Sequence, residues 1–216
     1  ETFRDTGGLW EKYPVEQVAT PEGWLRDPDL VTDFYNGLRK QLPTAQPNAG
    51  HLVLAEMEED YDVTVITQNV DDLHERAGSH RVIHLHGELM RVCSSRDPDN
   101  PHCWETLTAD RLEVRHGEKA KDGSLLRPWI VWFGEAVPNL DLAAREVEQA
   151  DIFAVIGSSL NVYPAAGLIR YAPANSPVFV IDPKPVRVPT RREVEVIQEV
   201  ASKGVPLLRD RLKQLG

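Results

Sequence analysis

Three short apolar runs constrain the fold of this chain most strongly. They are Val63–Ile66, Ile152–Ile156 and Val178–Ile181, and each is followed by small or polar residues. Runs of this length, rich in β-branched residues, are typical of strands that are buried on both faces, as in a parallel sheet covered by helices. The sequence therefore predicts an α/β fold.

Apolar residues at helical spacing occupy much of the chain between and after these runs. We expect helices over about residues 29–38, 48–59, 140–150 and 205–215, and another after residue 164. In the second of these helices we expect four side chains to point partly inward, namely Leu52, Leu54, Ala55 and Met57.

Polar side chains cluster after the first apolar run. Gln68, Asn69 and Asp71 follow it directly, at the strand edge where open α/β sheets bind ligands. His84 and His86 are two residues apart, so a strand would place both on one face. Because buried amide and carboxylate groups are costly unless paired, we expect a polar pocket here, with one histidine chemical and the other structural.

Composition narrows the choice of partners. The chain of 216 residues is 41% hydrophobic, which is enough for one large domain or one with a smaller inserted lobe. Its formal charge of −10 argues against direct nucleic-acid binding and is compatible with basic, lysine-bearing partners.

Only two cysteines occur, Cys93 and Cys103, so we expect no disulfide framework and a reducing, cytoplasmic location. We also expect no membrane span, because no apolar run is long enough.

Two motifs identify a family. The run TQNVDDLHERAG, followed by HLHGEL, closely resembles the sirtuins, the NAD-dependent protein-lysine deacylases, and especially their bacterial members. A third run, GSSLNVYPAAG, is similar to the sirtuin cofactor segment nearly throughout. Because these separated motifs agree in order and spacing, the resemblance spans essentially the whole chain.

The resemblance implies one catalytic domain with a Rossmann-like open parallel sheet and a small inserted lobe. The large lobe would comprise about residues 1–10, 61–87 and 130–216, and the small lobe about residues 11–60 and 88–129.

The implied reaction is the removal of acyl groups from protein lysines with consumption of NAD, a co-substrate. The acyl oxygen would attack C1′ of the nicotinamide ribose, and the products would be free lysine, nicotinamide and O-acyl-ADP-ribose. His86 would act as general base toward a ribose hydroxyl, and Asn69 and Asp71 would shape the nicotinamide pocket. Gln68 would contact the ribose, and His84 would be structural.

Further cofactor contacts follow from the same resemblance. Phe3 would shield the nicotinamide riboside, Arg4 would face the NAD phosphates or ribose, and Asp182 would accept hydrogen bonds from the adenosine ribose. The remaining expected contacts are Gly157, Ser158, Ser159 and Ala201. The chain opens at Glu1, so the strand and glycine-rich turn that precede Phe3 in sirtuins are not in this sequence.

The aromatic and β-branched run over residues 129–133 predicts a strand edge that can add a peptide as another strand. Sirtuins clamp the acyl-lysine peptide at positions matching Val131, Phe133, Gly134 and Glu135. The Val131 carbonyl would accept the acyl-amide N–H, and Phe133 would line the lysine tunnel.

The acyl pocket departs from one sirtuin pattern. Members that remove acidic acyl groups carry a small alanine and a Tyr-x-x-Arg pattern, which Ala19 and Tyr35 match. Leu38 stands at the arginine position, and Arg39 is displaced by one residue, about 100° on a helix. We therefore expect a preference for neutral acyl groups.

Many sirtuins hold a structural zinc with two Cys-x-x-Cys pairs. Here Cys93 lacks its pair, because Arg96 stands at the next ligand position. His102, Cys103 and His116 could in principle complete an unusual site, but the close spacing of His102 and Cys103 argues against it, so we expect no zinc or other metal. Packing should hold this lobe instead, with four candidate core residues: Trp104, Leu107, Leu112 and Val114.

Two alternatives stay open at this point. Related sirtuins act as NAD hydrolases or mono-ADP-ribosyltransferases, and the missing glycine-rich turn is compatible with an inactive module that binds NAD or peptide.

Overall fold

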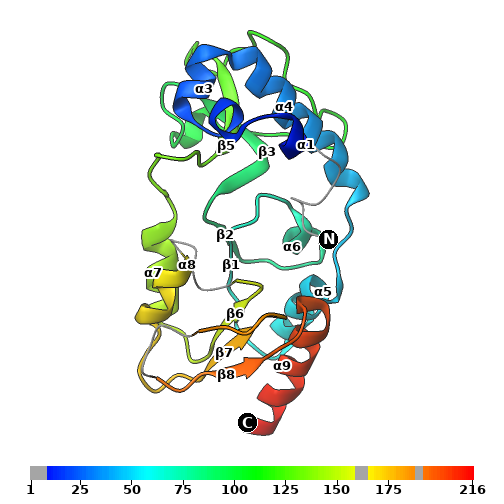
Figure 1. Cartoon of the computed structure of the whole chain (residues 1–216), viewed down its shortest axis with the longest axis vertical. Helices are drawn as coiled ribbons and strands as arrows, with labels where there is room; N and C mark the ends of the chain where they lie inside the picture. The colour runs from blue at the N-terminus through cyan, green and yellow to red at the C-terminus, as the bar shows by residue number, and fades with distance from the viewer. Residues whose placement is uncertain (1–8, 159–164, 188–191) are drawn as a thin grey trace. The chain divides into compact units, whose positions relative to one another are not determined.

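The structure is a computed structural model that describes residues 9–158, 165–187 and 192–216 (Figure 1). The chain divides into two compact units. Unit 1 contains residues 1–46, 69–72 and 84–138, and unit 2 contains residues 47–68, 73–83 and 139–216. We describe each unit by itself.

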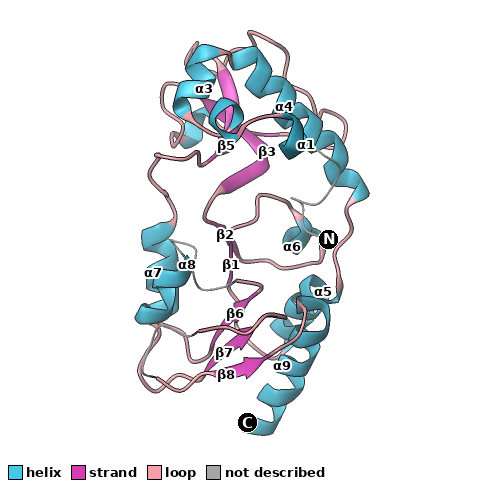
Figure 2. Ribbon diagram, in the orientation of Figure 1, coloured by secondary structure: helices cyan, strands magenta, loops and turns pink. Residues whose placement is uncertain are grey.

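Unit 2 is built on a parallel sheet of three strands in the order β6-β7-β8 (Figure 2). β6 (Phe153–Ile156) pairs with β7 (Val178–Ile181), and β7 pairs with β8 (Glu195–Ile197), both in parallel. All four residues of β7 are buried, as a strand covered on both faces requires. The apolar runs 152–156 and 178–181 thus form the strands that the sequence predicts.

Helices cover this sheet. α5 (Ala49–Glu56) continues into the 3-10 turn η2 (Met57–Glu59), and both contribute to one core with β7 and α9 (Ala201–Leu215). The remaining helices of unit 2 are α6 (Leu73–Arg76), α7 (Leu140–Glu148), α8 (Ala165–Leu168) and η4 (Ile169–Tyr171). The predicted helices near 48–59, 140–150, 205–215 and after 164 are all present.

Two further strands, β1 (Val65–Thr67) and β2 (Val82–His84), pair with each other. The Val65 N–H donates to the Arg81 carbonyl at 2.9 Å. The predicted strand at 63–66 is therefore present, and it ends directly before Gln68.

Unit 1 combines short helices with an antiparallel sheet. Its helices are α1 (Leu9–Lys12), α2 (Val15–Val18), α3 (Pro21–Arg26), α4 (Pro28–Gln41) and η1 (Leu42–Thr44). The Asp27 carboxylate caps α4 by accepting from the Leu30 N–H at 3.0 Å, next to Pro28 in the first turn. Phe34 and Leu38 of α4 lie in an apolar core with Trp24 and Trp132.

The sheet of unit 1 has the order β4-β3-β5, with β3 (Gly87–Ser94) between β4 (Glu105–Thr106) and β5 (Leu126–Ile130). A short 3-10 turn, η3 (Pro101–Cys103), precedes β4. Leu107 and Val114 lie in a second apolar core, as expected, together with Val92, Ala120 and Leu126. Trp104 instead packs against Trp129, with ring centroids 5.0 Å apart.

Several expectations need correction. The strand expected over residues 129–133 is β5, which runs from Leu126 to Ile130, so Val131 and Phe133 follow the strand. In α5, Leu52 is 44% exposed, and Val53 takes the inward position instead. α5 also packs in unit 2 with α9, whereas we expected residues up to 60 in the small lobe.

None of the described helices combines the length and apolar character that a bilayer crossing requires.

A close contact between β3 and β5 depends on Gly87. Its φ is +92°, and a Cβ there would lie 2.0 Å from the Trp129 carbonyl oxygen and 2.8 Å from the Ile130 Cα. These are backbone atoms of the partner strand, so they cannot rotate away. Only glycine therefore fits this position without separating the two strands.

We predict that Gly87→Ala lowers the free energy of unfolding by about 3 kcal/mol or more, because strain at positive φ adds to overpacking against backbone. Gly117→Ala is the matched control: its φ is +73°, but nothing lies within 4 Å of the added Cβ, so it should cost only about 1 kcal/mol. Urea unfolding of both variants measures the difference, and equal losses would contradict the role of the strand contact.

Candidate functional site

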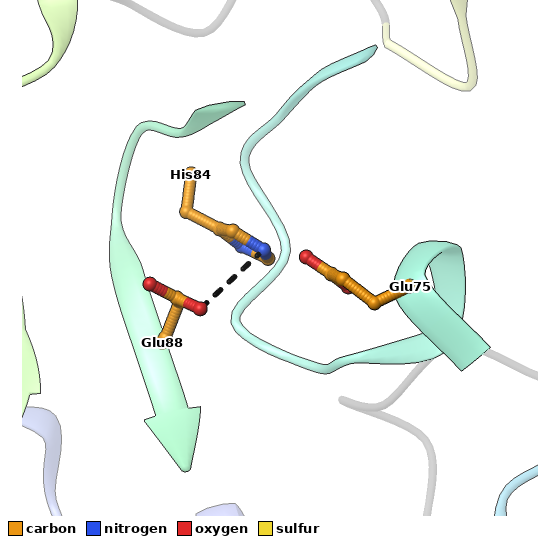
Figure 3. Close-up of side chains that lie close together, drawn as sticks. All are labelled: Glu75, His84 and Glu88. Atoms are coloured by element: carbon orange, nitrogen blue, oxygen red, sulfur yellow. Dashed lines mark ion pairs between the residues drawn. The ribbon is translucent and has the colours of Figure 1, made fainter. Parts of the chain in front are cut away.

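His84 is the buried member of the histidine pair. It ends β2, is 5% exposed, and its Nδ1 lies 3.1 Å from the Asn69 carbonyl oxygen. Its Nε2 lies 4.0 Å from a carboxylate oxygen of Glu88 on β3 (Figure 3). A ring held between a backbone carbonyl and a carboxylate has a fixed orientation, which suits the structural role expected for it.

His86 lies outside the strands. β2 ends at His84 and β3 begins at Gly87, so the two histidines are not neighbours on one continuous strand as we expected. The chain bends at residues 85 and 86, and the His86 side chain is half-buried. Of the two rings, that of His86 is therefore the more accessible to a ligand.

The polar residues after β1 are divided between exposed and buried positions. Gln68 is half-buried, Asn69 is exposed, and Asp71 is only 7% exposed. The segment containing Asn69 and Asp71 is fixed in unit 1, because the Leu89 N–H donates to the Val70 carbonyl at 2.8 Å.

The segment after β5 joins His86 to the expected peptide contacts. The Val131 N–H donates to the His86 carbonyl at 2.9 Å, and the Phe133 N–H donates to the Ala19 carbonyl at 3.0 Å. No described residue donates to the Val131 carbonyl, and the Phe133 side chain is 67% exposed. This segment therefore offers a main-chain acceptor and an apolar side chain beside the histidine.

Tyr35, Asn36 and Arg39 of α4 are buried and have hydrogen-bond partners. The Tyr35 hydroxyl donates to the Val18 carbonyl at 3.0 Å and accepts from Trp132 Nε1 at 3.0 Å. Burial raises the pKa of Tyr35 above its ordinary value of 10.0, so the hydroxyl keeps its proton. Arg39 is 1% exposed and donates to the Leu89 carbonyl at 2.8 Å and to Asn36 Oδ1 at 2.7 Å.

This packing bears on acyl recognition. Leu38 is 2% exposed and belongs to the apolar core of unit 1. Desolvation lowers the pKa of Arg39 to about 10, and the buried guanidinium remains charged at neutral pH. Its Nε and Nη1 donate to Leu89 and Asn36, so these two donors are engaged within unit 1.

In unit 2, three expected cofactor contacts lie where strands of the parallel sheet end. Gly157 follows β6 with φ +64°, and no atom of the residues that the structure describes lies within 4 Å of an added Cβ, so among these residues its backbone is open to a ligand. Asp182 follows β7, is 8% exposed, and its Oδ1 accepts from the Lys184 N–H at 2.8 Å. Ser158 comes directly after Gly157, and Ala201 begins α9. Open backbone next to a buried carboxylate at the carboxyl ends of parallel strands fits a dinucleotide.

Three of the expected contacts, Phe3, Arg4 and Ser159, lie outside the described residues. Their roles stay predictions.

Hydroxyl and carboxylate groups hold the turns beside Cys93. The buried Ser94 Oγ donates to Asp122 and lies 2.9 Å from Ser124 Oγ, which in turn donates to Asp122 Oδ1 at 2.6 Å. The N–H groups of Arg96 and Asp97 both donate to Ser94 Oγ, at 3.1 and 3.0 Å.

The possible zinc ligands are engaged in other ways. Burial raises the pKa of the Cys93 thiol to about 12, so the thiol is protonated at neutral pH in this structure. His116 lies 2.7 Å from Asp33, and Cys103 is a buried free thiol. The expectation that this lobe binds no zinc stays a prediction.

One residue of this region was missed in the sequence. Arg127 lies within β5 and is 5% exposed, and its guanidinium contacts Glu135. The available signal was an arginine inside an otherwise apolar run, because such a charge needs a partner when buried.

Comparisons with known proteins agree with this geometry. Residues 1–164 match the family described as Sir2. An NAD-dependent protein deacylase of Bacteroides thetaiotaomicron is 62% identical over 214 residues, which cover 99% of this chain and 90% of that protein. One of the same description from Helicobacter pylori is 49% identical over 201 residues, covering 93% and 85%.

Solved structures of Sir2 proteins are also similar to this chain. The structure of a Sir2 homologue in complex with NAD superposes with a TM-score of 0.81 at 37% identity, covering 100% of this chain and 84% of that one. A Sir2 protein bound to an acetylated peptide superposes with a TM-score of 0.75 at 27% identity, covering 94% and 85%. The fold is therefore the Rossmann-like α/β fold expected from the sequence.

The Ser94–Asp122–Ser124 network generates a prediction about pH. Hydrogen bonds from Ser124 and Ser94 hold the pKa of Asp122 at about 2, below its ordinary value of 3.8. A lowered folded-state pKa stabilises the fold above the unfolded value, and this contribution is lost as the pH falls from about 3.8 toward 2. Asp122→Asn should therefore lower the free energy of unfolding at pH 7, and the difference from the parent should shrink between pH 5 and 3.

Denaturant unfolding at several pH values measures this difference. Asp110→Asn is the matched control in the same lobe, because Asp110 is exposed and forms no hydrogen bond or ion pair with a described residue. A difference between parent and Asp122→Asn that does not change with pH would show that the ionised carboxylate is not what stabilises these turns.

Proposed function

The chain belongs to the Sir2 family, and from this premise we propose that it is an NAD-dependent protein-lysine deacylase. The observation that carries the proposal is the hydrogen bond from the Val131 N–H to the His86 carbonyl. It places the histidine expected to act as base next to the segment expected to bind the acyl-lysine peptide.

The peptide would bind as an added strand. β5 pairs with β3 on one side only, and the segment that continues from it has an open carbonyl at Val131. A main-chain acceptor of this kind suits the acyl-amide N–H of the modified lysine. Phe133, exposed beside it, would cover the aliphatic part of that lysine, and Ala19 and Gly134 leave room around it.

NAD, when bound, supplies the electrophilic carbon of its nicotinamide ribose and a good leaving group. The half-buried His86 would accept a proton from a ribose hydroxyl as general base. Asn69 and Asp71 would orient the nicotinamide, and Gln68 would contact the ribose. The buried Asp182 and the open backbone at Gly157 would hold the adenosine end, together with Ser158 and Ala201.

The partners in this proposal are proteins or peptides that carry acyl-lysine. The formal charge of −10 favours basic substrate segments over nucleic acid. Both cysteines are free thiols, which supports a reducing compartment such as the cytoplasm.

Neutral acyl groups would be the preferred substrates. Leu38 is apolar, the Tyr35 hydroxyl donates a hydrogen bond to the Val18 carbonyl, and Arg39 donates to Leu89 and Asn36. None of them supplies the charge-assisted contact that a succinyl carboxylate needs. A carboxylate buried without a partner costs several kcal/mol, so it would be rejected.

We predict that His86→Ala reduces the rate of acyl-dependent nicotinamide release by about 10²-fold or more, because the general base is removed. The thermal unfolding temperature should change little, since the ring is half-buried. His102→Ala, which removes an exposed histidine of the same unit, is the control and should keep parent activity. A folded His86→Ala protein with parent activity would remove His86 from the mechanism.

We also predict that kcat/KM is higher for acetyl-lysine, or a somewhat longer neutral acyl-lysine, than for succinyl-lysine in otherwise identical peptides. Tyr35→Phe should leave this ratio unchanged while lowering stability, because the hydroxyl serves Val18 and Trp132. The measurement is a matched peptide series on both proteins. A strong preference of the parent for succinyl-lysine would show that another residue anchors the carboxylate.

A further inference from the structure

Arg127 is a buried cation that donates hydrogen bonds to its own strand and to Glu135, beyond the end of that strand. Its Nη1 and Nη2 donate to the two carboxylate oxygens of Glu135, at 3.0 and 3.1 Å. Nη2 also donates to the Ile130 carbonyl at 2.8 Å, and Nε donates to the Pro128 carbonyl at 3.2 Å. The guanidinium carbon lies 3.5 Å from the ring centroid of Trp132. Such a two-point contact fixes direction as well as distance.

Glu135 completes the turn from its other side. Its Oε1 accepts from the Trp132 N–H at 2.8 Å, and its own N–H donates to the Trp132 carbonyl at 3.0 Å. Both carboxylate oxygens are therefore bound within unit 1, and the side chain is 25% exposed. From the sequence, we expected Glu135 to contact the peptide directly. A carboxylate with these partners is poorly placed to do so.

The residues between Arg127 and Glu135 include those that the proposed function expects to bind the peptide. Glu135 binds both the N–H and the carbonyl of Trp132, and Arg127 lies over its ring. Val131 and Phe133 are the direct neighbours of Trp132 in the chain. Gly134, with φ +88°, allows the chain to turn back toward Glu135. With Trp132 fixed, the Phe133 side chain is left pointing to solvent, 67% exposed.

We propose that Arg127 and Glu135 are positioning residues that hold residues 131–133 in the conformation that accepts the acyl-lysine peptide. This inference rests on the proposed function and assigns Glu135 an indirect role in place of direct substrate contact. It predicts an effect on peptide binding with little effect on NAD, because the hydrogen-bond partners of the pair, Pro128, Ile130 and Trp132, are not among the residues assigned to NAD.

The test uses Glu135→Gln, Arg127→Lys and the double variant. Glu135→Gln keeps the size and one acceptor for the Trp132 N–H but loses the charge that faces Arg127. Arg127→Lys keeps the charge but loses the two-point contact. Each should raise the KM for an acetyl-lysine peptide about tenfold or more, with the KM for NAD within about twofold of the parent. The double variant should be no worse than the more severe single one, because both remove the same interaction.

Glu118→Gln is the matched control. Glu118 also pairs with an arginine of unit 1, Arg111, and accepts from the Arg115 N–H, but it contacts none of residues 131–135. It should leave the peptide KM unchanged. A similar rise in this control would mean that any weakening of the unit impairs peptide binding, and the inference would fail.

A second readout does not depend on catalysis. Hydrogen exchange, followed by mass spectrometry without ligand, should show faster exchange of the Trp132 amide in Glu135→Gln than in the parent or in Glu118→Gln. Faster exchange with an unchanged peptide KM would overturn the positioning role. If the parent itself removes no acyl group, the proposed function fails. Unchanged exchange of the Trp132 amide in Glu135→Gln would show, independently of that result, that Arg127 and Glu135 do not hold residues 131–133.

Discussion

The close approach of β3 to β5 at Gly87 is the contact on which the arrangement of unit 1 depends. A side chain at this position would meet the Trp129 carbonyl at 2.0 Å, so only hydrogen allows the strands to pair there. Gly87 pairs with Ile130 in the register of the sheet, and the adjacent His86 carbonyl then accepts from Val131. His86 and the segment proposed to bind the peptide, which begins 45 residues later at Val131, are brought together beside this one small residue.

Elements with a single strong pattern were predictable from the sequence. β7 coincides with the predicted run 178–181, and α4 contains the predicted helix behind Pro28. In both, burial of an apolar face decides the local structure, and that face is visible as periodicity. Leu107 and Val114, which were candidates only because they are apolar, also lie in a core.

Elements whose stability comes from a distant partner were not predictable in this way. The strand was predicted over residues 129–133, whereas β5 begins at Leu126, because Arg127 interrupts the apolar run. The charge of Arg127 is balanced by Glu135, beyond the turn at Gly134. The histidines were expected on one strand because spacing alone does not show the bend before Gly87. Family resemblance gave the expected site residues, which stay predictions, but the partners of Tyr35 and Arg39 required the three-dimensional structure.

The protonated state of Cys93 has a consequence for oxidative stress. Peroxides attack the thiolate, and a thiol with a pKa of about 12 and no exposed surface offers almost none of it at neutral pH. The neighbouring turns are joined by Ser94, Asp122 and Ser124, whose oxygens have no comparable redox chemistry. Hydrogen bonds between such oxygens do not change when thiols are oxidised, whereas turns held by metal-bound thiolates lose both the thiolate and the metal.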